Sequence, residues 1–296
     1  MKTKKLKIWF ETLRPRTLPL AISSSLMGSF IAFFESKFSW YVAIFSLFTS
    51  IFLQILSNLS NDYGDFLKKA DLPERIGPKR GIHTNEISPE ELKKAIIIFI
   101  LFSLISGILL IYTGTKNLSF YIKIIYFLIG LLAIYSAIKY TIGNNPFGYR
   151  GLGDALVFIF FGLIGVIGTY YLHTHIFKLN LLLPSISIGL LSVGVLNINN
   201  IRDYNHDKKV NKKTLVVLKG LRFSKLYHFF LITSSILSLI IYNIIINAKI
   251  HQYVFLLTLP LLIKNVLAIF SFKEPTELNI QLKNLSITTF IITILF

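Results

Sequence analysis

The sequence predicts an all-α integral membrane protein that crosses the bilayer several times. Of its 296 residues, 53% are hydrophobic and only 15% are charged, which is more apolar than an ordinary soluble domain. The mean hydropathy is +0.64. The apolar residues also come in blocks of about 17–25, the length of helix that crosses a hydrocarbon core. Composition and block length together exclude an ordinary soluble enzyme.

Nine apolar segments are the predicted transmembrane helices. They lie at about 17–35, 40–60, 95–114, 119–140, 154–173, 181–198, 226–247, 251–270 and 282–296. Only the connections 61–94 and 199–225 are long, and loops of that length in a compact fold are usually functional. Ser88 and Pro89 have the pattern of an N-cap followed by the first helical residue, so a helix is expected to start there. We therefore expect one transmembrane domain, 1–296, with these two connections as its active-site loops.

The basic residues lie mostly on one side of the predicted helices. With the N-terminus in the cytoplasm, 25 of the 31 Lys and Arg residues fall on the cytoplasmic side, in 2–16, 68–94, 139–150, 202–225 and 273–283. Cytoplasmic loops carry such an excess, so we expect a cytoplasmic (inner) membrane protein with both long loops in the cytoplasm. The same rule accounts for the net charge of +17 without nucleic acid as a partner. The absence of cysteine excludes disulfides and thiol chemistry.

Two acidic clusters follow predicted helices, each at the start of a long connection. The first is Asn61-Asp62-Tyr63-Gly64-Asp65, and the second is Asn199-Asn200-Ile201-Arg202-Asp203, with Asp207 four residues further on. The acids of each cluster are three or four residues apart, so on a continuing helix they lie on one side. Carboxylates at the end of a membrane helix are costly unless they are paired or bind a cation. Two clusters of similar form therefore indicate one shared site.

The residue types in these clusters suit a metal ion and a phosphate group. Mg²⁺ prefers hard oxygen ligands and is usually bound by one or two carboxylates together with substrate phosphates. The candidate metal ligands are Asp62, Asp65, Asp203 and Asp207. Amide oxygens come from Asn61, Asn199 and Asn200. Basic residues that suit phosphate oxygens are Lys68, Arg75, Lys79, Arg80, Arg202 and Lys212.

Acids and bases interleaved in this way indicate a metal–diphosphate site in the wall of a membrane protein. Its substrate would have a charged head and a long apolar tail. A cation-coupled transporter is the alternative class, because acids within membrane helices also relay protons or sodium. Transport acids are expected deep in the helices, however, and here the deep positions are almost wholly apolar.

The two clusters resemble the aspartate-rich motifs of the UbiA superfamily of intramembrane prenyltransferases. Further segments resemble the branch of that superfamily that prenylates 1,4-dihydroxy-2-naphthoate. They are Leu13–Pro19, Asp71–Gly81, Tyr149–Asp154, and Asn197–Asp203 with Thr214–Val217. The resemblance runs in order over nearly the whole chain. It implies a bundle of about nine transmembrane helices around a central cavity, with a cytoplasmic cap formed by the two long loops.

The resemblance also implies an activity. The four aspartates would hold two Mg²⁺ ions that bridge a polyprenyl diphosphate, and Arg202 and the other basic residues would neutralise the leaving diphosphate. The prenyl group would pass to 1,4-dihydroxy-2-naphthoate with loss of CO2, giving a demethylmenaquinone in menaquinone biosynthesis. Tyr63 and Tyr204 are candidate contacts of the aromatic ring or the allylic cation. A sister prenyltransferase with a different aromatic acceptor is the alternative within the superfamily.

The sequence departs from the family pattern at Ile142, Asn144, Asn145 and Asn211. Asn145 stands where the family usually has Lys, which removes a possible partner of a phosphate or carboxylate. Asn211 stands where Gly usually precedes the Lys of the second motif. Because Asn is the next-best residue for a left-handed backbone, we expect Asn211 to keep that conformation.

Overall fold

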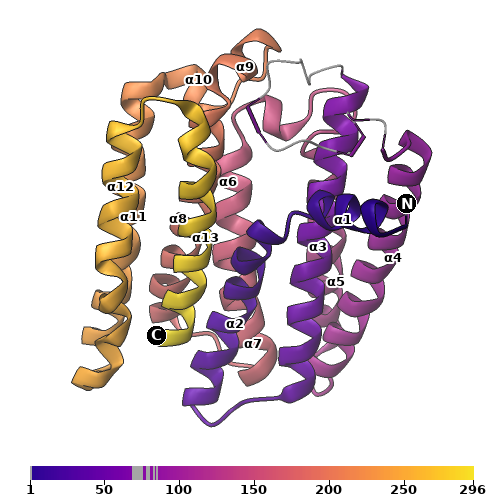
Figure 1. Ribbon diagram of the computed structural model, residues 1–296. Helices are drawn as coiled ribbons and strands as arrows, with labels where there is room; N and C mark the ends of the chain where they lie inside the picture. The colour runs from indigo at the N-terminus through magenta and orange to yellow at the C-terminus, as the bar shows by residue number, and fades with distance from the viewer. Residues whose placement is uncertain (1, 69–75, 78–80, 83, 85) are drawn as a thin grey trace.

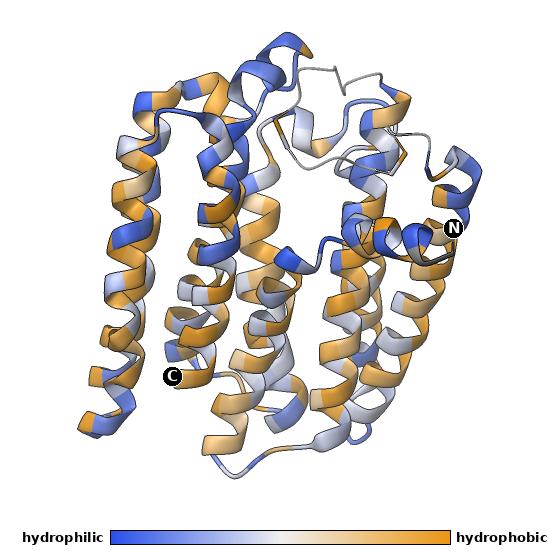
Figure 2. Ribbon diagram, in the orientation of Figure 1, coloured by the Kyte–Doolittle hydropathy of each residue, from blue (hydrophilic) through white to orange (hydrophobic). Residues whose placement is uncertain are grey.

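The computed structural model describes residues 2–68, 76–77, 81–82, 84 and 86–296, and this part of the chain contains helices and no β-strand. Nine helical segments of it are long and apolar enough to cross a membrane. They run side by side as a bundle (Figure 1), and hydrophilic residues gather at its upper end (Figure 2). The predicted all-α membrane fold is confirmed.

Each predicted transmembrane helix corresponds to one observed segment. In chain order these are α2 (Leu18–Phe34), α3 (Trp40–Leu67), α4 (Pro89–Gly114), α5 (Phe120–Lys139), the continuous run of α6 (Gly153–Val157), η3 (Phe158–Gly168) and α7 (Thr169–Thr174), α8 (Leu182–Arg202), α11 (Leu221–Ile245), η5 (Ile250–Thr258) with α12 (Leu259–Ser271), and α13 (Leu278–Leu295). The largest differences are at helix ends. Hydropathy marks only the apolar part of a helix, whereas α3 continues past position 60 and carries the first acidic motif on its last turns.

The long connections contain more helix than the sequence suggested. Connection 199–225 includes the end of α8, the short helices α9 (Tyr204–Lys209) and α10 (Leu215–Lys219), and the start of α11. At the end of connection 61–94, the hydroxyl oxygen of Ser88 accepts a hydrogen bond from the Glu91 backbone N–H at 3.1 Å. The Glu91 carboxylate in turn accepts one from the Ser88 N–H at 3.0 Å. This capping box confirms the predicted start of α4.

The N-terminal helix α1 (Lys2–Thr12) lies across the bundle and not along it (Figure 1). Its residues Ile8 and Trp9 pack against a buried hydrophobic cluster that includes Leu56 and Leu59. The Lys4 ammonium pairs with Glu86 at 3.1 Å. Helix α1 therefore attaches to the region just before α4, and it leads through the short 3-10 helix η1 (Pro15–Thr17) into α2.

Helices α2 and α8 form the centre of the bundle. Helix α8 packs against η3, α11 and α13, and α2 packs against α3, η3 and α13. At Gly28 of α2, an added Cβ would lie 2.3 Å from the Val166 carbonyl oxygen of η3. Only glycine allows this approach, which is the small-residue packing typical of membrane helices. The two helices that carry the acidic motifs, α3 and α8, are thus placed on either side of α2.

Candidate active site

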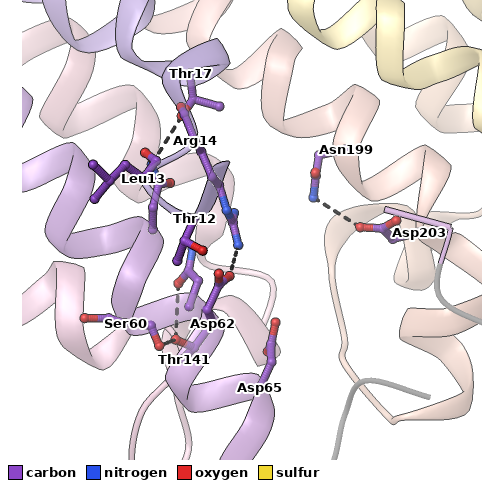
Figure 3. Close-up of polar contacts among 12 residues, drawn as sticks. Thr12, Leu13, Arg14, Thr17, Ser60, Asp62, Asp65, Thr141, Asn199 and Asp203 are labelled. Atoms are coloured by element: carbon purple, nitrogen blue, oxygen red, sulfur yellow. Dashed lines mark hydrogen bonds and ion pairs between the residues drawn. The ribbon is translucent and has the colours of Figure 1, made fainter. Parts of the chain in front are cut away.

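A cavity of about 340 Å³ lies among α2, α3, α4, α5, the η3–α7 segment and α8. Both acidic motifs line one end of it, through Asn61 and Asp65 of α3 and through Asn199, Asn200 and Asp203 at the end of α8. Figure 3 shows the two groups on opposite sides, with Asp62 and Asp65 facing Asn199 and Asp203. The structure therefore brings the two motifs together across a single cavity.

The first motif is held by contacts from two other segments. Asp62, only 1% exposed, forms an ion pair with Arg14 (Figure 3). Arg14 has a left-handed backbone (φ 55°) at the start of η1, and it also lines the cavity. The Thr141 hydroxyl lies 3.1 Å from Asn61 Oδ1 and 2.8 Å from the Ser60 carbonyl oxygen. These contacts fasten the last turns of α3 to η1 and to the segment after α5.

Tyr149 connects the first motif to the lysines of both motifs. Its hydroxyl donates a hydrogen bond of 3.0 Å to Asp65 Oδ1. The Lys68 ammonium lies 3.9 Å from the centroid of its ring, and the Lys212 ammonium lies 5.6 Å from it. Both distances are within the range of cation–π attraction. Burial lowers the pKa of Lys68, and the charge of Asp65 acts in the opposite direction.

In the second motif, Arg202 forms an ion pair with the carboxylate of the next residue, Asp203. The Arg202 Nε lies 2.8 Å from Asp203 Oδ1, and Nη2 lies 2.7 Å from Oδ2, so the ion pair is bidentate. The same guanidinium donates to Asn199 Oδ1 at 2.8 Å and to Asn279 Oδ1 at 2.9 Å. Arg202 is only 2% exposed. It therefore orients Asp203 and ties the end of α8 to α13.

The surroundings of Asp207 show whether this end of the cavity suits a cation. It lies on α9, is buried, and has an Oδ2 atom with no hydrogen-bond partner. Lys212 Nζ lies 3.6 Å from its other oxygen. Burial raises the pKa of Asp207 to about 6, and Lys212 opposes this rise. A buried carboxylate oxygen without a donor requires an explanation, and a bound ion is one of the usual ones.

The acids occur as pairs. In the part of the chain that the structure describes, no three His, Asp or Glu side chains converge as a preformed metal cage. Mg²⁺ usually takes one or two carboxylates and completes its shell with water and substrate phosphates. The residues present therefore fit an ion of that kind, bound together with a phosphate-bearing substrate.

Other predicted site residues lie elsewhere. Tyr63 and Tyr204 do not line the cavity, and each packs against a buried hydrophobic cluster. The remaining predicted basic residues lie outside the described residues. They are Arg75, Lys79 and Arg80. Asn211 has a φ of 55°, which confirms the expected left-handed backbone.

Sequence reasoning did not select three residues that the structure places at the site, namely Arg14, Tyr149 and Asn279. Arg14 and Tyr149 lie in the segments Leu13–Pro19 and Tyr149–Asp154, which carry the family resemblance, so that resemblance was the available signal. Asn279 lies at the start of α13. It belongs neither to an acidic motif nor to a segment that carries the resemblance, and only the folded structure brings it to Arg202.

Comparisons with known proteins agree with this geometry. The profile of the UbiA prenyltransferase family matches residues 21–288. The 1,4-dihydroxy-2-naphthoate octaprenyltransferase of Haemophilus influenzae is 43% identical, covering 100% of this chain and 96% of its own length. That of Escherichia coli is 40% identical, covering 93% of this chain and 89% of its own. The structure of a UbiA homolog from Archaeoglobus fulgidus bound to GPP and Mg²⁺ has a similar fold, with a TM-score of 0.58 and 17% identity over 94% of this chain and 98% of that one. The chain belongs to the UbiA prenyltransferase family.

Proposed function

We propose that this protein transfers a polyprenyl group from a polyprenyl diphosphate to 1,4-dihydroxy-2-naphthoate, with Mg²⁺ as cofactor and with loss of CO2 and diphosphate. The observation that carries the proposal is the cavity itself, which has both acidic motifs at one end and mostly apolar and hydroxyl side chains elsewhere. The names of the two relatives at 43% and 40% identity support the acceptor. The Mg²⁺ and GPP bound by the Archaeoglobus homolog support the cofactor and the kind of donor.

The four motif aspartates are the proposed holders of the metal. Asp65 and Asp203 reach the cavity wall directly, while Asp62 and Asp207 are buried beside it. When bound, Mg²⁺ supplies Lewis-acid neutralisation of the diphosphate. Arg14 and Arg202 hold Asp62 and Asp203 in place. Lys212 lines the cavity and Lys68 lies beside the Tyr149 ring, and both are the proposed point charges for the diphosphate oxygens.

The remaining chemistry needs orientation and the exclusion of water. The allylic C–O bond breaks, and its electron pair leaves with the diphosphate. The acceptor ring then attacks through the carbon that bears the carboxylate, so a C–C bond forms. The bond to CO2 breaks and returns its electron pair to the ring, so no basic residue has to take a proton from carbon. Leu156, Phe160 and Phe161 line the cavity and keep water from capturing the allylic cation.

The test uses purified protein in nanodiscs with radiolabelled polyprenyl diphosphate and dihydroxynaphthoate, with Mg²⁺ or with EDTA. We expect prenylated naphthoquinol and CO2 only with Mg²⁺. If the protein binds the prenyl diphosphate with Mg²⁺ but forms no product, the acceptor is wrong and another aromatic acceptor has to be sought. If it binds neither substrate, the assignment fails, and cation-coupled transport becomes the function to measure.

Matched carboxylate variants sharpen this test. We expect Asp62→Asn and Asp203→Asn each to lower turnover by about a hundredfold or more, because each removes a charge that holds the metal. Asp154→Asn is the control. Asp154 accepts a hydrogen bond from the Tyr227 hydroxyl at 3.2 Å and does not line the cavity. Near-wild-type turnover in either motif variant would contradict the proposed metal site.

We also propose that the end of the bundle with the acidic motifs faces the cytoplasm, where connections 61–94 and 199–225 form a cap. The excess of basic residues on that side supports this orientation. Because the chain has no cysteine, single-cysteine labelling needs no prior changes. Lys208→Cys should resist a membrane-impermeant maleimide in intact cells, and Lys116→Cys should react. The reverse pattern would overturn the orientation.

A further inference from the structure

The cavity extends far beyond the acidic motifs. Asp65 and Ser46 both line it and both lie on α3, so about 28 Å of helix axis separates them. Helix α8 lines only the motif half, from Ser192 to the end of the helix. The distal half is bounded by α3, α4, α5 and the η3–α7 segment. We call it the tail branch, and it is lined by Ser46, Thr49, Gly107, Tyr126, Gly130 and Leu172.

The chemistry of the tail branch differs from that of the motif half. The charged residues that line the cavity, within the described chain, are Arg14, Arg16, Asp65, Arg202, Asp203 and Lys212. All of them belong to the motif end or to the η1 segment beside it. The walls of the tail branch are instead apolar residues, hydroxyls and glycines. The branch therefore suits an uncharged apolar chain connected to a charged head at the other end.

Two glycines widen the tail branch. Gly107 lies in α4 and Gly130 in α5, and at both an added Cβ would have no atom within 4 Å. The hydroxyl of Thr49 lies 3.1 Å from that of Ser106, which places Gly107 at the distal end. Glycine inside a helix is unfavourable relative to alanine. Unlike Gly28, neither residue permits a close helix contact, so packing does not explain their small size.

Tyr126 closes the branch on the side of η3. Its hydroxyl donates a hydrogen bond of 3.0 Å to the Gly168 carbonyl oxygen, and its ring stacks on Tyr171 at 6.1 Å. The main packing partners of α5 are α3 and α4. Tyr126 therefore bridges α5 to the η3–α7 segment and forms part of the boundary of the branch.

We propose that Gly107 and Gly130 determine which prenyl chain lengths the enzyme accepts, by keeping the tail branch open for the isoprene units farthest from the diphosphate. The inference rests on the proposed function for the identity of the donor, but it does not depend on the aromatic acceptor. Larger side chains at these positions would occupy the branch. They would exclude long chains and leave short chains, which end before the branch, unaffected.

The test compares the wild type with Gly107→Leu and Gly130→Leu. Binding of geranyl, geranylgeranyl and octaprenyl diphosphates is measured in nanodiscs with Mg²⁺ and without acceptor, and kcat/KM is measured with dihydroxynaphthoate. We expect the variants to keep the wild-type affinity for geranyl diphosphate and to lose about tenfold or more for octaprenyl diphosphate. Ile108→Phe and Leu128→Phe are the matched controls, because both side chains are exposed on the same two helices and neither lines the cavity.

The outcomes separate the two proposals. If the wild type does not prenylate dihydroxynaphthoate but the glycine variants still lose long donors selectively in the binding measurement, the proposed function falls and this inference stands. If the variants lose short and long donors equally, or lose neither, the inference is overturned whatever the activity. The same holds if the control variants change chain-length preference as the glycine variants do.

Discussion

Replacement of Arg202 tests how the second motif is held. The Arg202 side chain donates to both oxygens of Asp203, to Asn199 and to Asn279, at 2.7–2.9 Å. Both Arg202 and Asp203 are buried, at 2% and 7% exposure. Breaking such a pair by removing one partner costs about 3–5 kcal/mol, because a buried charge loses its counterion. Arg202→Ala should therefore be strongly destabilising.

Two further variants separate the contributions of single contacts to this loss of stability. Asn279→Ala removes one hydrogen bond to a charged group, worth about 1.5–3 kcal/mol. Arg202→Lys keeps the charge but loses the fork that reaches both carboxylate oxygens, so it should fall between the other two. If a large domain loses about 2–4 °C of Tm for each kcal/mol, Arg202→Ala should melt about 10 °C below the wild type.

The assay is thermal unfolding of the protein in nanodiscs, together with the Mg²⁺ dependence of turnover. A purely structural role would lower Tm alone. A role in orienting Asp203 should also raise the Mg²⁺ concentration needed for half-maximal activity in Arg202→Lys, at a temperature where that variant is folded. Unchanged Tm in Arg202→Ala, with an unchanged Mg²⁺ requirement in Arg202→Lys, would refute the reasoning.

Substitutions at three other positions have definite expected outcomes. Tyr149→Phe removes the hydrogen bond to Asp65 but keeps the aromatic ring beside the lysines, so kcat should fall about tenfold. An unchanged kcat would show that this hydrogen bond has no role in turnover. Asn211→Val should lower the free energy of unfolding by about 1–2 kcal/mol, because the backbone of residue 211 has a φ of 55°. Asn211→Gly should have the Tm of the wild type. An equal Tm for the two variants would contradict this prediction. Gly28→Ala places a Cβ 2.3 Å from the Val166 oxygen and should lower Tm, while a wild-type Tm would mean that α2 can move away from η3 without cost.

The sequence by itself determined the class of the fold and the number of transmembrane helices. Both depend on a local property, the length of an apolar run, which the bilayer thickness selects directly. The start of α4 at Ser88 was also predictable from the sequence, since a helix cap depends on residues only three positions apart. The acidic motifs were also visible, because carboxylates next to apolar helices are rare unless they have a function. Helix ends were less well predicted, since the polar turns of α3 carry no hydropathy signal.

Only the tertiary structure decided which side chains meet. Arg14 reaches Asp62 across 48 positions of the chain, and Tyr149 reaches Asp65 across 84. Likewise, Arg202 proved to be a partner of Asp203, although its charge alone suited it equally well to phosphate. These contacts depend on how far each helix is rotated and how closely it approaches its neighbours. Packing of the whole bundle sets both quantities, and no local pattern of residues encodes them.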